Sequence, residues 1–187
     1  MSATLNKPRA TARDFFRLPE GTLAQLIDAE VIMSPAPKTF HQQIIQNLSI
    51  TLGTYIRKKK AGKLFTSPID VYFSENEVYQ PDALFMAKEN LSKIKDWGIE
   101  GAPDLVIEVL SVSTAYYDLT HKKRVYEDFQ VKEYLIIDPM EQTAELFVQD
   151  NGNGFSSFFL LRTTGEVAFQ TLPGLTLTLA EIFDSGL

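Results

Sequence analysis

The chain has 187 residues, of which 44% are hydrophobic and 22% charged, and its formal net charge is −6 at pH 7. This composition is typical of one ordinary globular domain, and the acidic balance argues against a protein that coats nucleic acid by charge alone. The absence of cysteine excludes disulfides and thiolate chemistry and fits a reducing compartment, so we expect a cytoplasmic protein. No apolar stretch approaches the ~20 residues of a membrane helix, so we expect no membrane association.

We expect residues 1–12 to form a flexible N-terminal tail, because the basic residues there are followed by no apolar run. Residues 13–187 contain no internal repeat and no low-complexity linker, which predicts a single domain. Residues 22–33 indicate a short helix or strand that leads into a strand at residues 30–33. Two prolines, Pro35 and Pro37, then break the chain.

An amphipathic helix follows these prolines. Apolar residues recur at steps of three and four after Thr39, a candidate N-cap, and the pattern continues to about Lys60, where Gly62 closes it. The end of this helix carries a basic cluster, made up of Arg57, Lys58, Lys59, Lys60 and Lys63. Such a cluster is either a solvated face or a contact for nucleic acid, and the sequence leaves both interpretations open.

The rest of the chain alternates strands and helix. Three strand-like runs occupy residues 64–73, 82–86 and 104–110, with a polar segment at residues 88–101 before the third. A helix is predicted over residues 118–129, and further strands at residues 134–138, 144–148 and 155–161, with a hairpin turn at residues 150–154. Strands interleaved with two helices predict an α/β fold whose mixed sheet is covered on both faces.

Glu108 interrupts the run of residues 105–110, which is otherwise apolar at both parities. Such a run is typical of a central strand buried on both faces. A carboxylate there must be neutralised, pair with a cation or bind a metal. The pattern therefore favours a functional site at Glu108, with a structural ion pair as the alternative.

A lysine stands inside the apolar stripe of the helix that follows this strand. At ~100° per residue, Lys122 falls in the middle of that stripe. The apolar members of the stripe are Leu119, Val125, Tyr126 and Phe129. A lysine that points at a sheet either extends along the surface to solvent or enters a pocket lined by carboxylates.

Three aspartates are candidates for the second carboxylate of such a pocket. Asp104 lies four residues before Glu108 in the same strand, so their α-carbons are ~13 Å apart and cannot share one metal. Asp82 starts a separate strand, and since neighbouring strands are only ~4.8 Å apart, its side chain can converge with that of Glu108. Asp70 is a weaker competitor that could equally face solvent on an edge strand.

Four motifs in fixed order resemble the Uma family, whose members are assigned as endonucleases of the restriction-endonuclease-like PD-(D/E)xK superfamily. They are Gln80-Pro81-Asp82, the segment from Ala102-Pro103-Asp104 to Glu108-Val-Leu-Ser111, Asp118-x-x-x-Lys122-x-x-x-Tyr126, and the segment from Val131 to Asp138-Pro139. The resemblance runs from about Asp14 to Leu175 and implies a three-layer α/β/α core with a mixed β-sheet. Additional antiparallel strands would follow at the C-terminus.

The resemblance also implies a Mg²⁺-dependent phosphodiesterase that acts on DNA, with Mn²⁺ as a substitute metal. Asp82 and Glu108 match the family's acidic residues and, with a strand carbonyl such as that of Val109, would bind the metal. The strand lysine expected two residues after Glu108 is replaced by Leu110, and Lys122 matches the helical lysine that substitutes for it in the family. Catalysis is therefore expected from Asp82, Glu108 and Lys122.

Three further residues have possible accessory roles. His41, near a helix N-terminus that favours its neutral form, would assist proton transfer or contact phosphate, or else be structural. Gln25 stands where the family has a glutamate, so it brings no charge and would weaken metal binding. Tyr126, one turn after Lys122, would brace that lysine or simply pack in the core.

The same residues are compatible with functions other than a nuclease. The main alternative is a catalytically degenerate nucleic-acid-binding module of the same fold, favoured by Gln25 and the net charge. A glycosidase is disfavoured by the inward lysine and by the single tryptophan, Trp97, and a purely structural interaction protein has no positive support. Lys93, Lys95 and Trp97 either contact phosphate or base or belong to a solvated loop. We also expect a homodimer, since a duplex offers two strands to cut.

Overall fold

The computed structural model describes residues 9–150 and 154–186. Its centre is a six-stranded sheet in the order β12-β11-β10-β9-β6-β3. The strands are β3 (Gly62–Thr66), β6 (Ala83–Ala87), β9 (Leu105–Val109), β10 (Glu133–Asp138), β11 (Thr143–Gln149) and β12 (Phe155–Arg162). β9 and β10 run parallel and the other neighbours run antiparallel, so the sheet is mixed.

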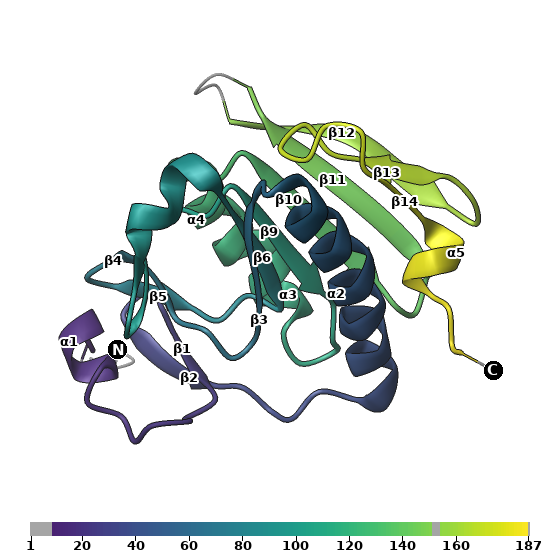
Figure 1. Cartoon of the computed structure of the whole chain (residues 1–187). Coiled ribbons are helices and arrows are strands. Elements are labelled where there is room, and N and C mark those ends of the chain that lie inside the picture. Colours follow the sequence, from purple (N-terminus) through teal and green to yellow (C-terminus); the bar gives the residue numbers. More distant parts are fainter. Residues whose placement is uncertain (1–8, 151–153, 187) are drawn as a thin grey trace.

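Helices cover both faces of this sheet (Figure 1). The long helix α2 (Thr39–Lys59) packs on one face, where its apolar residues meet those of β6, β9, β10 and β11. The opposite face is covered by the helical segment of residues 115–128 and by a second sheet, and together they form a separate apolar cluster. The three layers and the antiparallel strands β11 and β12 confirm the predicted α/β architecture.

The second sheet was not anticipated from the sequence. Its order is β2-β1-β5-β4-β8-β7. The strands are β1 (Ala24–Ile27), β2 (Glu30–Met33), β4 (Val71–Ser74), β5 (Glu77–Tyr79), β7 (Ile94–Lys95) and β8 (Gly98–Glu100). The remaining elements are α1 (Ala12–Phe15), the 3₁₀ helix η1 (Lys88–Lys93), the hairpin of β13 (Glu166–Ala168) and β14 (Thr176–Thr178), and α5 (Leu179–Ile182). The segment of residues 88–101, predicted only as polar, therefore contributes η1, β7 and β8.

The prediction of one strand over residues 64–73 was wrong. The chain forms β3 in the central sheet, leaves it, and enters β4 of the second sheet. Pro68 stands between the two strands and has no N–H to donate to a ladder, which explains the interruption. The break carries Asp70 away from the central sheet.

Helix α2 spans nearly the predicted residues, but its caps differ from the predicted ones. Lys38 is the N-cap, with extended backbone and no side-chain cap hydrogen bond, so Thr39 is the first helical residue and not the cap. The last helical residue is Lys59, and the C-cap Lys60 adopts the left-handed conformation with φ 52°. Gly62 begins β3 instead, and a Cβ there would lie 1.9 Å from the carbonyl oxygen of Met86.

The helical segment after β9 is not a regular α-helix. It begins as α3 (Ala115–Tyr117), earlier than predicted, widens into the π-helix η2 (Asp118–Lys122) and ends as α4 (Lys123–Asp128). A π turn closes one residue later than an α turn, so it rotates less per residue. Leu119 therefore leaves the predicted apolar stripe and is 46% exposed, whereas Lys122 points inward as predicted and is 2% exposed.

The predicted N-terminal tail and the predicted C-terminal hairpin both lie partly outside the described residues. Of the predicted tail, residues 1–8 lie outside the described residues, while the N–H groups of Ala10 and Ala12 donate to the carbonyl oxygens of Ala29 and Glu75. β11 and β12 pair as an antiparallel hairpin, but residues 151–153 of the predicted turn are likewise outside the described part. Within the described ranges, no helix is long and apolar enough to cross a membrane.

Candidate active site

Five of the predicted site side chains line one cavity of about 670 Å³. The cavity lies where the first turn of α2 meets the end of β9 and the start of β6. The five are Gln25, His41, Asp82, Glu108 and Lys122. Tyr126 is fully buried behind them. The structure thus brings together residues that are spread over about a hundred positions of the sequence.

Asp82 and Glu108 converge across two neighbouring strands. β6 and β9 pair antiparallel with Ala83 opposite Ile107, which places the two acidic residues next to each other at the end of the ladder. The backbone N–H of Asp82 lies 3.4 Å from Oε2 of Glu108. Oδ2 of Asp82 accepts a hydrogen bond from the N–H of Val109 at 2.8 Å. The predicted proximity of the two carboxylates is confirmed.

Lys122 makes two buried ion pairs. Its Nζ lies 2.9 Å from Oε1 of Glu108 and 2.7 Å from Oδ1 of Asp118, and all three side chains are at most 3% exposed. The cluster thus holds two carboxyl groups and one ammonium group in a buried environment. The cluster therefore has two acidic groups, Glu108 and Asp118, but only one basic group, Lys122.

The pKa shifts reflect this imbalance. Burial is the largest influence on Glu108 and, with the charges of Asp118 and Asp82, raises its pKa to about 8 against the opposing effect of Lys122. Burial lowers the pKa of Lys122, but the charges of Glu108 and Asp118 outweigh it and raise the pKa overall. The lysine therefore remains an ammonium ion, and an additional cation near the carboxylates would be stabilised.

His41 lies against Asp82. Its Nε2 is 3.2 Å from Oδ2 of Asp82, and its Nδ1 is buried without a hydrogen-bond partner among the described residues. Burial lowers the pKa of His41, but hydrogen bonding to Asp82, the charge of Asp82 and a backbone hydrogen bond to Val109 raise it overall. The carboxylate thus opposes the helix dipole that was expected to favour the neutral form.

Gln25 forms part of the cavity wall, and both ends of its amide have partners. Oε1 accepts a hydrogen bond from the N–H of Gln80 at 3.1 Å, and Nε2 donates to Oγ of Ser34 at 3.5 Å. The side chain is 5% exposed. The amide fixes the segment that leads into Asp82, so it stabilises the wall of the cavity.

The family model described as "Putative restriction endonuclease", Uma2, matches residues 12–180. The chain belongs to the Uma2 family. This match confirms the family resemblance that the ordered motifs indicated, and it places the chain among nucleases of the restriction-endonuclease-like type. Nucleic acid is the class of ligand that this membership implies.

Two further proteins are similar to this chain. An uncharacterized protein of Synechocystis sp. is 29% identical over 117 residues, which cover 62% of this chain and 66% of that protein. The crystal structure of a protein from Anabaena variabilis, described as a putative nuclease belonging to DUF820, superimposes with a TM-score of 0.77 at 20% identity. The superposition covers 92% of this chain and 97% of that one, and it shows a shared restriction-endonuclease-like fold.

Asp118 is the site residue of this Uma2 chain that sequence reasoning missed. It is 1% exposed and forms one of the two ion pairs of Lys122. Its position four residues before Lys122 was the available signal, because such residues face each other on a helix. Two other aspartates lie elsewhere: Asp104 pairs with Lys132, and Asp70 bonds to Gln80.

Tyr126 packs in the buried core, which was one of the two expected alternatives, and it also contacts the site. Its hydroxyl donates to Oε1 of Glu108, the oxygen that also pairs with Lys122, at 2.7 Å. Burial, followed by the charge of Glu108, raises the pKa of Tyr126 well above its usual value. The phenol therefore stays protonated and holds one oxygen of the carboxylate in place.

The donor set fits a divalent cation of the Mg²⁺ type. Within residues 9–150 and 154–186, no group of three or more His, Cys, Asp or Glu side chains is arranged to hold a metal. Two adjacent carboxylates and the carbonyl of Val109 are nevertheless the hard oxygen donors that Mg²⁺ prefers, and Mg²⁺ normally keeps several waters. The raised pKa of Glu108 means that this site favours an added positive charge, which a metal ion would supply in place of the proton.

Proposed function

We propose that this protein is a metal-dependent endonuclease that hydrolyses phosphodiester bonds in DNA, with Asp82, Glu108 and Lys122 as its catalytic residues. The observation that carries the proposal is the pair of adjacent carboxylates beside a buried lysine, in one cavity of a restriction-endonuclease-like fold. Asp82, Glu108 and the carbonyl of Val109 would hold Mg²⁺, or Mn²⁺ in its place. When bound, the metal would activate water and offset charge on the phosphate.

The side chains around the carboxylates have distinct tasks in this proposal. Lys122 and Tyr126 both donate to Oε1 of Glu108, so they fix this oxygen and leave the rest of the carboxylate for other partners. The ammonium group of Lys122 also lines the cavity and adds positive charge where the phosphate would lie. Nε2 of His41 lies 3.2 Å from Oδ2 of Asp82 and, in this proposal, would hold the proton that passes to the leaving oxygen.

Plasmid nicking at low salt tests the proposal. The wild type, Glu108→Gln and Asp82→Asn are compared with Mg²⁺, with Mn²⁺ and with EDTA, and Asp128→Asn, an exposed acid outside the cavity, is the matched control. We expect cleavage by the wild type and the control with either metal, and none by the two site variants. If Glu108→Gln cleaves plasmid at the wild-type level, or if cleavage persists in EDTA, the assignment is refuted.

A degenerate nucleic-acid-binding module is the second candidate, and Gln25 is the observation that favours it. Its neutral amide is already engaged by Gln80 and Ser34, so the cavity lacks a third carboxylate there. A wild type that binds DNA without metal-dependent turnover would support this candidate. Gln25→Glu would then be expected to increase metal uptake, which calorimetry with Mn²⁺ measures directly.

Partner and assembly are further parts of the proposal. DNA is the proposed partner, and a homodimer would bring two such cavities to the two strands of a duplex. Light scattering of the purified chain, alone and with a duplex, would distinguish a monomer from a dimer. A monomer that nicks one strand would limit the proposal to single-strand cleavage.

A further inference from the structure

A second cavity, of about 640 Å³, lies beside the candidate active site. Pro68 and Gln80 line both cavities, and Gln80 stands two residues before Asp82 in the chain. Two cavities that share wall residues are neighbours. Gln80 therefore joins a phosphate site at Asp82 to the wall of the second cavity.

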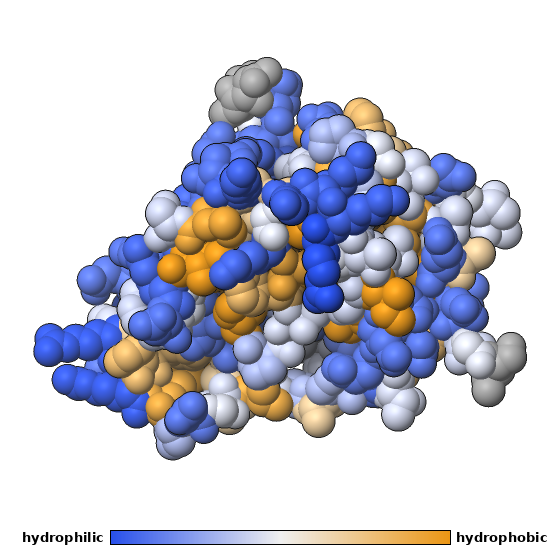
Figure 2. Space-filling model, in the orientation of Figure 1, coloured by the Kyte–Doolittle hydropathy of each residue, from blue (hydrophilic) through white to orange (hydrophobic). Residues whose placement is uncertain are grey.

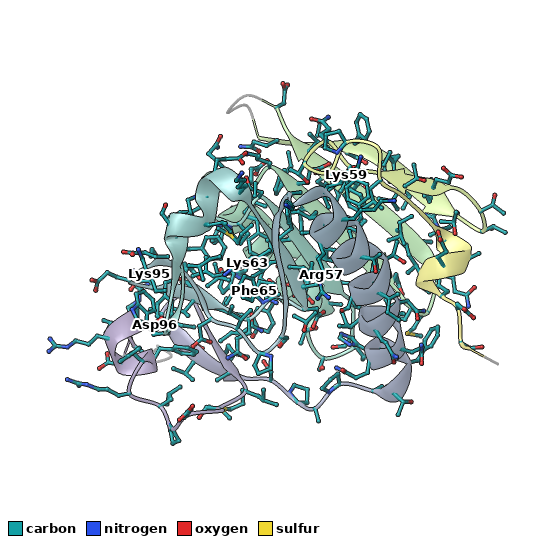
Figure 3. All side chains as sticks on the ribbon, viewed as in Figure 1. Arg57, Lys59, Lys63, Phe65, Lys95 and Asp96 are labelled. Atoms are coloured by element: carbon teal, nitrogen blue, oxygen red, sulfur yellow. The ribbon has the colours of Figure 1, made fainter. Side chains whose placement is uncertain are left out.

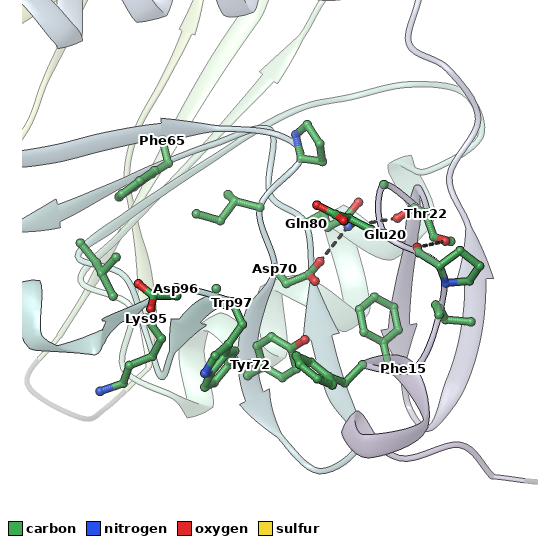
Figure 4. A pocket seen from close by; sticks show the side chains of 18 residues that line it. Phe15, Glu20, Thr22, Phe65, Asp70, Tyr72, Gln80, Lys95, Asp96 and Trp97 are labelled. Atoms are coloured by element: carbon green, nitrogen blue, oxygen red, sulfur yellow. Dashed lines mark hydrogen bonds between the residues drawn. The ribbon is translucent and has the colours of Figure 1, made fainter.

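The wall of the second cavity is rich in aromatic side chains (Figure 4). Trp97 is 45% exposed, and its ring meets that of Tyr72 edge-on, with 4.9 Å between the centroids. Phe16 contacts the same indole at 6.4 Å, also edge-on. The volume lies in the usual range of small-molecule sites, about 300–1,000 Å³. Aromatic walls of this kind stack nucleobases of any sequence.

The polar groups of this cavity suit a base better than a phosphate. Oδ1 of Asp70 accepts a hydrogen bond from Nε2 of Gln80 at 2.7 Å, the carboxyl group also interacts with the hydroxyl of Tyr72, and no cation of the described residues pairs with it. Figure 4 shows Asp70 between Gln80 and the aromatic side chains. Glu20 and Asp96 add negative charge to the wall, while Lys95 donates to the carbonyl of Ser92. Such a wall repels phosphate, and Asp70 can accept from an exocyclic amino group.

Positive charge lies just outside this cavity. Phe65 lines it and also lines a third cavity of about 410 Å³, to which Arg57 and Lys63 contribute. Lys63 and Phe65 are two residues apart on the edge strand β3, so they share one face of the sheet. Figure 3 shows them between Arg57 and Lys95, and Figure 2 shows hydrophilic and apolar surface side by side on this face. Backbone phosphates can thus be bound next to an apolar surface.

We propose that the cavity lined by Asp70, Tyr72 and Trp97 binds one unstacked nucleobase of the substrate strand, next to the phosphate that is cleaved. The substrate class is then single-stranded or locally unpaired DNA, because a base must leave the duplex before it enters such a pocket. Bases with an exocyclic amino group bind best, since Asp70 accepts from that group. The inference rests on the proposed nuclease function for the adjoining phosphate site.

Trp97 is the single tryptophan of the chain, so its fluorescence reports on this cavity directly. The wild type is titrated in EDTA, which prevents cleavage, with oligonucleotides of about eight nucleotides, within the range of single-strand sites. The probes are oligo-dC, oligo-dT, an oligomer of the same length without bases, a duplex and oligo-rC. We expect quenching by oligo-dC, and affinity weaker by about ten-fold or more for the baseless oligomer and the duplex.

Variants separate stacking from base recognition. Trp97→Leu is followed by the anisotropy of labelled oligo-dC and is expected to weaken binding about ten-fold. Asp70→Asn is expected to remove the preference for oligo-dC over oligo-dT, while Asp128→Asn, the matched exposed control, keeps it. Thermal melting of each variant shows that the fold is intact. Tighter binding of oligo-rC than oligo-dC would support the base pocket and assign it to RNA.

Two results overturn the base pocket. One is equal binding of oligo-dC and the baseless oligomer, and the other is a Trp97 fluorescence that no oligonucleotide changes. Either result, obtained together with metal-dependent nicking of plasmid, would leave the nuclease proposal standing. Conversely, base-dependent quenching in a protein that never nicks DNA would support the pocket and refute the nuclease.

Discussion

Replacing Lys122 by methionine tests whether the lysine compensates the buried negative charge. Lys122→Met keeps the approximate length of the side chain but leaves Glu108 and Asp118 together without a cation. Breaking a buried ion pair by removing one partner typically costs about 3–5 kcal/mol. For a chain of this size, each kcal/mol lowers the melting temperature by about 2–4 °C, so the expected decrease is about 6–20 °C.

The charge explanation also predicts a rescue. Combining Lys122→Met with Glu108→Gln and Asp118→Asn removes all three charges, so we expect most of the lost stability to return although catalysis does not. Glu108→Gln alone should cost much less than Lys122→Met, because Lys122 keeps its pair with Asp118. Urea unfolding of the four proteins, followed by circular dichroism, gives the free energies.

Lys58→Met, a lysine exposed on α2, provides the matched control and is expected to change stability by at most about 0.5 kcal/mol. A Lys122→Met protein as stable as this control would show that Lys122 does not compensate the carboxylates. A triple variant no more stable than Lys122→Met alone would show that lost packing, and not unpaired charge, is the cause.

Three further predictions concern stability. Burial raises the pKa of Asp104, but hydrogen bonds from Lys132, the N–H of Ala87 and Asn90 together hold it below its usual value. The contribution of Asp104 to stability is therefore present above the unfolded pKa and is lost as the pH falls below about 4. Asp104→Asn should flatten this acid limb of a urea-denaturation series. Gly62→Ala should destabilise the fold by at least about 1 kcal/mol, because its Cβ would meet a backbone oxygen; an unchanged melting temperature would contradict this. Lys60→Gly should raise the stability by up to about 1 kcal/mol, since Lys60 has φ 52°, and calorimetry decides the sign.

The central sheet and the core of the site could be predicted because the informative residues break apolar patterns. Glu108 inside a strand that is otherwise apolar, and Lys122 inside the inner stripe of a helix, each require a buried partner. The adjacency of Asp82 followed from the spacing of neighbouring strands. The regular periods and spacing of helices and strands are therefore enough to place these three residues from the sequence.

The second sheet and the exposure of Leu119 could not be predicted in the same way. The strands of that sheet are short, with two to four residues each, so they carry little periodic signal. Asp118 falls on the inner stripe at ~100° per residue as well, so its spacing of four residues from Lys122 could have identified it. The exposed position of Leu119 follows from the π-helix, whereas the sequence pattern assumed the rotation of an α-helix.

The location of the lysine on a short helical segment has a consequence for local opening. Glu108 belongs to a central strand, and its removal from the site requires disruption of the whole sheet. Lys122 belongs to the helical segment of residues 115–128, whose opening would leave the hydrogen bonds between the strands in place. The ion pairs of Lys122 therefore also fasten this segment to the sheet. Hydrogen exchange at the amides of α4 would record how often the site comes apart while the rest of the protein remains folded.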